Sequence, residues 1–195
     1  KMQQRSVAKE SRSSGHSLSK KSFLALIDNL ESFIASLKWE PKDTEWAEYY
    51  GQTNYSSDAF KDKKKVIGEF LDILQPREVW DIGGNRGVFS RIASEKNIPT
   101  ICFDEDPAAV EKNYLEMRKK QERNILPLVF DIANPSPTIG WAWQERNSLK
   151  ERGPADTVFA LALMHHLAIS DNVPFTDMAR FFSMLGKSVI LEFVP

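Results

Sequence analysis

The chain has 195 residues, which is enough for one domain with a sizeable core and too few for two typical domains. Hydrophobic residues make up 42% and charged residues 27%, as in an ordinary globular protein. With 26 basic and 27 acidic side chains the net charge is -1, so no overall field attracts nucleic acid or an anionic membrane. The single cysteine, Cys102, excludes an internal disulfide and fits a reducing compartment, and no apolar run approaches a membrane span. These features predict a cytoplasmic protein without membrane partners.

Residues 1–21 are basic, serine-rich and almost free of large apolar side chains, which predicts a disordered tail or a linker. Apolar residues then recur at helical spacing and predict an amphipathic helix over residues 22–38. A second helix is expected to start near Ser57, with this serine as its cap, and to end before Pro76.

We interpret residues 22–76 as an N-terminal helical cap or lid segment. Between the two expected helices lies an aromatic-rich stretch that ends at Tyr55, and we include Tyr55 among the candidate ligand contacts. The lysines of the second helix are expected on a solvated face; they are Lys61, Lys63, Lys64 and Lys65.

An abrupt glycine-rich turn follows the apolar strand that ends near Asp81. A dinucleotide fingerprint starting at Gly83 would require glycines at Asn85 and Val88, and the Gly-Lys-Ser/Thr of a P-loop is also absent. The pattern that remains is Asp-x-Gly-x-x-x-Gly, from Asp81 to Gly87. A carboxylate at this place repels phosphates and attracts a cationic ligand. S-adenosylmethionine, which carries a sulfonium and an ammonium group and no phosphate, fits that description.

Apolar strands and helices alternate through the remainder of the chain. Strands are expected at 100–104, 126–131, 157–163 and 188–194, and helices at 88–96, 107–120 and 174–185. Continuous apolar runs are typical of strands buried on both faces. Residues 77–195 are therefore predicted to form an α/β core, Rossmann-like and doubly wound, with a mainly parallel sheet.

Three expected strands end in an acid, namely Asp81, Asp104 and Asp131. Because ligands bind beyond the carboxyl ends of the strands in open α/β sheets, we expect these carboxylates on one rim, with Glu105 beside them. Asp104 can accept hydrogen bonds from both ribose hydroxyls of a nucleoside. The alternative is that such acids only cap turns and helix N-termini.

The turn from Asp81 to Gly87 resembles motif I of the class I S-adenosylmethionine-dependent methyltransferases, and the resemblance covers roughly residues 79–194. It implies that the methionine part of the cofactor lies against glycines, namely Gly83, Gly84 and Gly87. It further implies that Asp104 holds the ribose and that Asp131 and Ile132 hold the adenine.

Shorter stretches resemble a bacterial family of nodulation-associated methyltransferase-like proteins; they are residues 44–46, 53–55, 134–137 and 165–170. The class I sheet normally continues with a sixth and a seventh strand, for which this chain has no matching segment. We therefore expect a core that lacks the last two strands and belongs to a longer, multidomain protein, or whose apolar edge is covered by the N-terminal helices.

His165 and His166 follow the fourth expected strand, where it opens into the site. One of them can serve as a general base for a substrate hydroxyl or amine, since imidazole titrates near neutrality. The pair can equally be structural, with one ring capping the strand end and the other packed. A shared metal is the third possibility, but no further Cys/His cluster supports it, and we expect no metal. Both histidines are taken as candidate catalytic residues.

The leading hypothesis is an S-adenosylmethionine-dependent methyltransferase that acts on a small or carrier-bound molecule, with an oxygen, nitrogen or carbon acceptor. One alternative is a non-catalytic S-adenosylmethionine-binding or protein-interaction module. An RNA methyltransferase is another, although residues 160–163, at the end of the fourth expected strand, lack the Asp/Asn-Pro-Pro-aromatic pattern of amino-group methyltransferases. An NAD-linked oxidoreductase is disfavoured by the glycine spacing.

Overall fold

The computed structural model describes residues 18–39, 44 and 56–194. The chain divides into two compact units, Lys1–Glu40 and Pro41–Pro195. The described part of the first unit is mainly one helix, α1 (Lys20–Ser36), which begins where the Ser19 side chain accepts a hydrogen bond from the Ser22 amide at 3.1 Å. None of the helical residues is buried. The amphipathic helix predicted over residues 22–38 is thus present, shifted by two residues.

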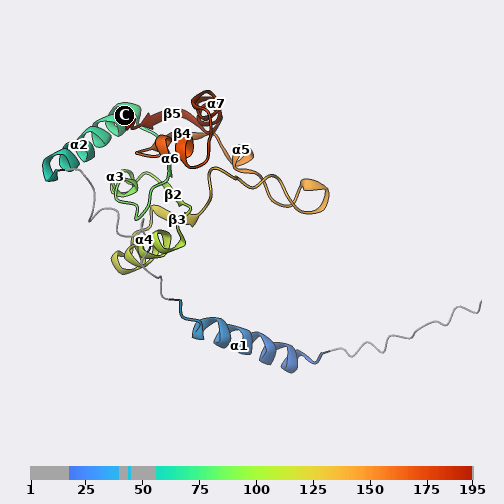
Figure 1. Cartoon of the computed structure of the whole chain (residues 1–195). Helices are drawn as coiled ribbons and strands as arrows, with labels where there is room; N and C mark the ends of the chain where they lie inside the picture. Colours follow the sequence, from blue (N-terminus) through green and yellow to red (C-terminus); the bar gives the residue numbers. More distant parts are fainter. Residues whose placement is uncertain (1–17, 40–43, 45–55, 195) are drawn as a thin grey trace, which may run out of the picture. The chain divides into compact units, whose positions relative to one another are not determined.

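The second unit is built on a five-stranded sheet whose neighbouring strands all run parallel, in the order β3-β2-β1-β4-β5 (Figure 1). The strands are β1 (Val79–Ile82), β2 (Thr100–Asp104), β3 (Ile125–Val129), β4 (Ala155–Ala160) and β5 (Gly186–Leu191). The order reverses between β1 and β4, which is the place where doubly wound sheets bind their ligands. The doubly wound parallel sheet predicted from the sequence is confirmed.

Helices cover both faces of this sheet. They are α2 (Ser57–Leu74), α3 (Ser90–Ser94), α4 (Pro107–Lys120), α5 (Leu149–Arg152), α6 (Met164–Ile169) and α7 (Phe175–Leu185). Alternate residues of β1 point to opposite faces: Trp80 packs with α5, α6 and α7, whereas Val79 packs with α2 and α3. The sheet is therefore buried on both sides, as its apolar strands predict.

Helix starts and stops follow ordinary capping chemistry. α4 begins at Pro107 because the Asp106 side chain accepts the Ala108 amide at 2.9 Å, as the sequence predicts. At α2 the cap is Ser56, whose side chain accepts the Ala59 amide at 3.2 Å, and not the predicted Ser57. The helix predicted over 88–96 is reduced to α3, and its cap position has no side-chain hydrogen bond.

Three strands end earlier than the sequence suggests, and one of them is β5, which ends at Leu191 instead of the predicted residue 194. β3 ends at Val129 because its partner β2 ends opposite it, at Asp104, so Asp131 lies beyond the strand. β4 ends at Ala160, and the backbone turns at Ala162, which has a φ of 53°, before α6 begins. α6 itself is not anticipated from the apolar run.

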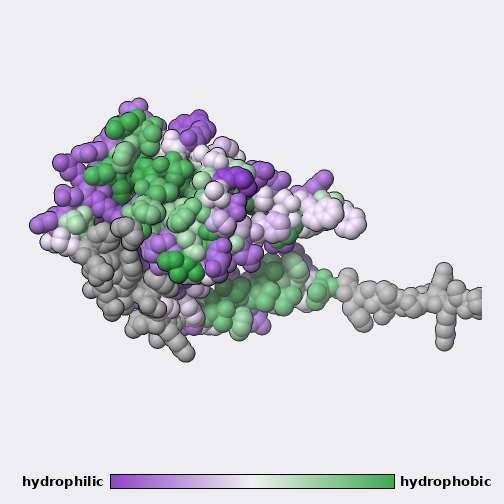
Figure 2. Space-filling view, turned by 45° about the horizontal axis from the view of Figure 1, so that its top comes forward, coloured by the Kyte–Doolittle hydropathy of each residue, from purple (hydrophilic) through white to green (hydrophobic). Residues whose placement is uncertain are grey.

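Between β3 and β4 the chain makes an excursion that projects from the core (Figure 1). It contains a short 3₁₀ helix, Trp141–Trp143, and is closed by an antiparallel bridge between Ile139 and Arg146. Elsewhere, apolar side chains gather on the surface over α2 and the end of β5 (Figure 2); they include Val66, Phe70, Ile73, Val189 and Leu191. Among the helices of the described residues, none combines the length and apolarity needed to cross a bilayer.

Candidate functional site

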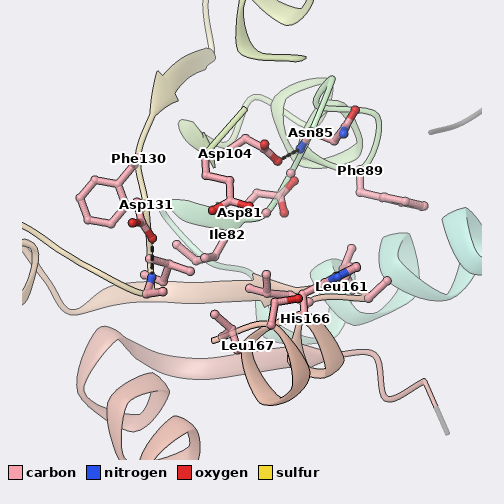
Figure 3. A pocket seen from close by; sticks show the side chains of 18 of the residues that line it. Asp81, Ile82, Asn85, Phe89, Asp104, Phe130, Asp131, Leu161, His166 and Leu167 are labelled. Atoms are coloured by element: carbon pink, nitrogen blue, oxygen red, sulfur yellow. Dashed lines mark hydrogen bonds between the residues drawn. The ribbon is translucent and has the colours of Figure 1, made fainter. Parts of the chain in front are cut away.

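A pocket lies at the carboxyl ends of the strands, at the point between β1 and β4 where the strand order reverses (Figure 3). Its walls come from the turn after β1, the ends of β2 and β3, the loop after β4, α6 and one side of α2. It holds about 1200 Å³ of space, part of it open to solvent. The pocket is the candidate ligand site, because doubly wound sheets bind their ligands at this point of the strand order.

In the glycine-rich turn, backbone without side chains forms part of the pocket wall. The amides of Gly83 and Gly84 both donate to the carbonyl of Phe103, at 2.9 and 3.0 Å, which anchors the turn on β2. Gly83 has a φ of 72°, a conformation that residues with a Cβ rarely adopt. A Cβ on Gly84 would lie 2.5 Å from Cys102 Sγ, so no other residue fits there. The turn is therefore packed closely against β1 and β2, at Asp81 and Cys102.

Asp104 presents its carboxylate to the pocket in an orientation fixed by the backbone. One oxygen accepts the Asn85 amide at 2.8 Å (Figure 3). The other oxygen accepts the Asp106 amide at 2.9 Å. Burial raises the pKa of Asp104 above its usual value, against these two hydrogen bonds. Each carboxylate oxygen keeps a further lone pair for hydroxyl donors of a ligand.

Asp81 is buried at the bottom of the turn and also lines the pocket. Its carboxylate accepts a hydrogen bond from the Ser90 hydroxyl at 2.5 Å. Burial raises the pKa of Asp81 to about 6, so the group is mostly anionic at neutral pH. A negative charge in such a poorly solvated place favours a cationic ligand group.

Asp131 and Ile132 line the far end of the pocket, after β3. Asp131 is exposed, and one oxygen of its carboxylate accepts the amides of Ala133 and Asn134 at 2.8 and 3.2 Å. It therefore closes its own turn, as the capping alternative anticipates, while it also lines the pocket. Glu105 lines the pocket beside Asp104, and burial together with the neighbouring acid Asp131 raises its pKa.

The two histidines lie on α6 and not on the end of a strand, and they differ in their access to the pocket. Their ring centroids are 4.0 Å apart. His166 lines the pocket, and burial and the neighbouring His165 lower its pKa. His165 is not among the lining residues, and its Nδ1 is buried without a hydrogen-bond partner in the described part of the chain.

The structure therefore brings together most of the predicted site residues: Asp81, Gly83, Gly84, Asp104, Glu105, Asp131, Ile132 and His166. Gly87 is not a lining residue and faces Asn113 and Arg91 behind the turn. Tyr55 falls outside the described residues. No group of three or more His, Cys, Asp or Glu side chains within the described ranges is arranged to hold a metal ion.

One wall of the pocket was missed by sequence reasoning. Phe60 and Lys63 of α2 line it together with Phe89, and the Lys63 ammonium lies 4.2 Å from the centroid of the Phe89 ring. Lys63 also forms an ion pair of 2.6 Å with Glu192, so its predicted place on a solvated face is wrong. The spacing of Phe60, Lys63 and Ile67 puts Lys63 on the apolar stripe of the helix, and this signal could have identified it.

The chain is similar to nodulation protein NoeA of Rhizobium meliloti, with 37% identity over 180 residues. The match covers 91% of this chain but only 38% of that protein, so the chain spans well under half of its relative's length. It confirms the resemblance to nodulation-associated proteins that the sequence indicates. No family model matches the chain.

Solved structures of methyltransferases share the fold. The bifunctional kinase-methyltransferase WbdD matches with a TM-score of 0.53 and 16% identity, over 85% of this chain and 35% of that one. Coclaurine N-methyltransferase, bound to N-methylheliamine and SAH, matches with a TM-score of 0.53 and 16% identity. The match covers 91% of this chain and 52% of that one. Magnesium protoporphyrin IX methyltransferase from Synechocystis, with bound SAH, matches with a TM-score of 0.52 and 16% identity. The match covers 90% of this chain and 72% of that one. The fold is thus that of the class I methyltransferases.

Proposed function

We propose that this chain, which has the class I methyltransferase fold, is an S-adenosylmethionine-dependent methyltransferase acting on a small or carrier-bound molecule. The observation that carries the proposal is the pairing of Asp81 and Asp104 on either side of the Gly83–Gly84 turn, within one pocket. A carboxylate for ribose hydroxyls, a second one in a poorly solvated place and bare backbone between them match the chemistry of this cofactor.

The charges around the pocket favour this cofactor over a dinucleotide. Among the described lining residues the carboxylates are Asp81, Asp104, Glu105, Asp131 and Asp171. Lys63 is the only lysine or arginine among them, and it is already paired with Glu192. A diphosphate would be repelled here, whereas a sulfonium and an ammonium would be attracted.

We assign the residues to parts of the cofactor as follows. Gly83 and Gly84 contact the methionine part, and Asp104 holds the ribose. Three further lining residues, Glu105, Asp131 and Ile132, surround the adenosine. The assignment is supported by their order along the rim, from the turn after β1 to the loop after β3.

The bound cofactor would supply an electrophilic methyl group, and the protein would supply placement and a base. His166 is the proposed base: its lowered pKa keeps the ring neutral and able to accept a proton near pH 7. The apolar and aromatic wall formed by Phe60, Phe89 and Leu161 would exclude water from the acceptor. In this arrangement α2 acts as the cap of the acceptor side.

Calorimetry with S-adenosylmethionine and NAD in parallel tests the proposal. We expect saturable binding of S-adenosylmethionine and none of NAD at the same concentration. Turnover is then sought with a panel of hydroxyl-containing and carrier-bound acids. Binding of NAD alone would contradict the proposal. Cellular fractionation would test the cytoplasmic location, which the lone buried Cys102 favours.

A second candidate is a cofactor-binding module that works through protein contacts. The specific observation that favours it is α1, none of whose residues is buried and whose apolar side chains are exposed, including Phe23, Leu30 and Phe33. Such a helix face is typical of protein–protein contact. Tight S-adenosylmethionine binding without methylation of any acceptor on the panel would favour this candidate.

A further inference from the structure

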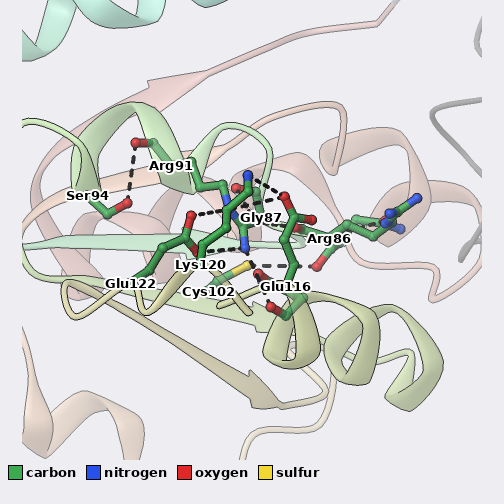
Figure 4. A network of polar contacts seen from close by, with 10 residues as sticks. Arg86, Gly87, Arg91, Ser94, Cys102, Glu116, Lys120 and Glu122 are labelled. Atoms are coloured by element: carbon green, nitrogen blue, oxygen red, sulfur yellow. Dashed lines mark hydrogen bonds and ion pairs between the residues drawn. The ribbon is translucent and has the colours of Figure 1, made fainter. Parts of the chain in front are cut away.

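The glycine-rich turn is supported from behind by a buried arginine. Arg91, on α3, is 7% exposed and is not among the residues that line the pocket. It lies next to Arg86 and Gly87 of the turn (Figure 4). Its guanidinium donates to the carbonyl of Arg86 at 2.7 Å and to the carbonyl of Gly87 at 3.2 Å. These are the last two residues of the motif that begins at Asp81.

The same guanidinium is fixed on its other side by acids of the neighbouring segment. Its Nε and one terminal nitrogen donate to the two carboxylate oxygens of Glu122, at 3.0 and 2.9 Å. Glu116 of α4 lies 3.8 Å from the Arg91 Nε (Figure 4). A bidentate pair of this kind is geometrically specific, so Arg91 has a defined position from which to hold the turn.

The turn needs such support because its backbone is unusual. Gly83, Asn85 and Gly87 all have positive φ, at 72°, 49° and 72°. Glycine is free to leave such a conformation, and holding it costs more entropy than for any other residue. On the pocket side the turn is held by the bond from the Asn85 amide to Asp104. On the opposite side it is held by Arg91, and a Cβ on Gly87 would lie 3.0 Å from the Arg91 guanidinium.

We infer that Arg91 is a positioning residue that fixes the turn for the methionine part of S-adenosylmethionine. The inference rests on the proposed function for the identity of the ligand. Arg91 does not touch the pocket, and it acts through the carbonyls of Arg86 and Gly87. The ribose carboxylate is less dependent on it, because Asp104 is also held by the Asp106 amide.

The test compares two ligands on variants of the full chain. S-adenosylhomocysteine has the amino-acid part and 5′-methylthioadenosine lacks it. For Arg91→Met we expect affinity for S-adenosylhomocysteine to fall by about tenfold or more, with affinity for methylthioadenosine within about threefold of wild type. Arg91→Lys keeps the charge but cannot reach both carbonyls and Glu122. Its affinity for S-adenosylhomocysteine should therefore lie between those of wild type and Arg91→Met.

Two further variants separate positioning from general stability. Glu122→Gln keeps the bonds from Arg91 to the carbonyls, and we expect affinity for S-adenosylhomocysteine within about threefold of wild type even if the protein melts earlier. Arg77→Met is the matched control, since Arg77 pairs with Asp156 on an exposed surface outside the pocket. It should leave both affinities unchanged.

Hydrogen exchange without ligand gives a readout that does not depend on the cofactor's identity. In Arg91→Met and Arg91→Lys, amides of residues 83–88 should exchange about tenfold faster, with β4 and β5 unchanged. Equal loss of both ligands, an unaltered turn, or the same ligand profile in Glu122→Gln would overturn the inference. If the wild-type protein itself binds neither ligand, faster exchange of the turn in the Arg91 variants would support the positioning role and contradict the proposed cofactor.

Discussion

At the scale of single residues, Asp104 is the clearest test of the cofactor assignment. Its carboxylate is oriented by the amides of Asn85 and Asp106 and faces the pocket. We expect Asp104→Ala to weaken S-adenosylmethionine binding by about 1.5–3 kcal/mol, the scale of hydrogen bonds to a charged group. Calorimetry measures the change, and Asp177→Ala on the exposed side of α7 is the control. Normal affinity in a folded Asp104→Ala protein would remove Asp104 from the ribose role.

The histidine pair separates catalysis from structure, because only His166 lines the pocket. If His166 is the base, His166→Ala should lower turnover by about two to four orders of magnitude with little change in cofactor affinity. His165→Ala should lower the melting temperature and leave turnover per folded molecule within about tenfold.

If His166 is the base, its pKa determines in which direction turnover changes with pH. A base must be unprotonated, and burial lowers the pKa of His166 below its usual 6.5. Turnover should therefore fall as the pH drops through this lowered pKa and reach a plateau at higher pH. The acidic limb should disappear from the residual activity of His166→Ala. A limb that persists there would assign the titration to another group, such as Asp81, whose pKa is about 6.

At the scale of elements, the glycine-rich turn depends on the absence of side chains. A Cβ on Gly84 would lie 2.5 Å from Cys102 Sγ and 2.9 Å from the Asp81 carboxylate, both in the buried interior. Gly84→Ala should therefore shift the turn and reduce S-adenosylmethionine affinity at least about tenfold, by calorimetry.

Gly68 of α2 provides the matched control for this substitution. A Cβ there would lie 3.9 Å from Ile92, an ordinary contact, and Gly68 is inside a helix. Gly68→Ala should raise stability by about 0.5–1 kcal/mol and leave cofactor affinity unchanged. If Gly84→Ala binds as tightly as Gly68→Ala, the close approach at the turn is not required.

The elements differ in how well the sequence predicts them, for physical reasons. β1, β2 and α4 have strong local signals, namely an apolar run, a second apolar run and an Asp-Pro cap. α6 has none, because its residues continue the apolar run of β4 and the break depends on the backbone at Ala162. Strand ends depend on the neighbouring strand, which is why β3 ends two residues before Asp131.

The site residues also differ in how well the sequence predicts them. Asp81, Gly83, Gly84 and Asp104 could be predicted, because their residue types and spacing state their chemistry locally. The different access of His165 and His166 to the pocket could not be predicted, because the helix that directs only one ring into the pocket is not visible in the sequence. The helical spacing could have placed Lys63 on the apolar stripe of α2, but its ion pair could not be predicted, because Glu192 lies 129 residues later in the chain.

At the scale of the whole molecule, the ion pair between Lys63 and Glu192 joins α2 to the chain just after β5. The ammonium and the carboxylate are 2.6 Å apart, and the two side chains are only 14% and 22% exposed. A pair with so little solvent around it is weakly screened, and removing one partner leaves the other charge poorly solvated. We therefore expect α2 to be held against the pocket in part by this contact between distant segments.

A double-mutant cycle with Lys63→Met and Glu192→Gln measures that contribution. From denaturant unfolding we expect a coupling free energy of about 0.5–3 kcal/mol. The comparison is the exposed pair of Arg180 and Asp177 on α7, 3.2 Å apart with side chains 74% and 53% exposed, for which we expect about 0–0.5 kcal/mol. Because Lys63 also lines the pocket, loosening α2 should weaken binding of the acceptor more than binding of the cofactor. Equal coupling in the two pairs would mean that this ion pair does not hold the cap.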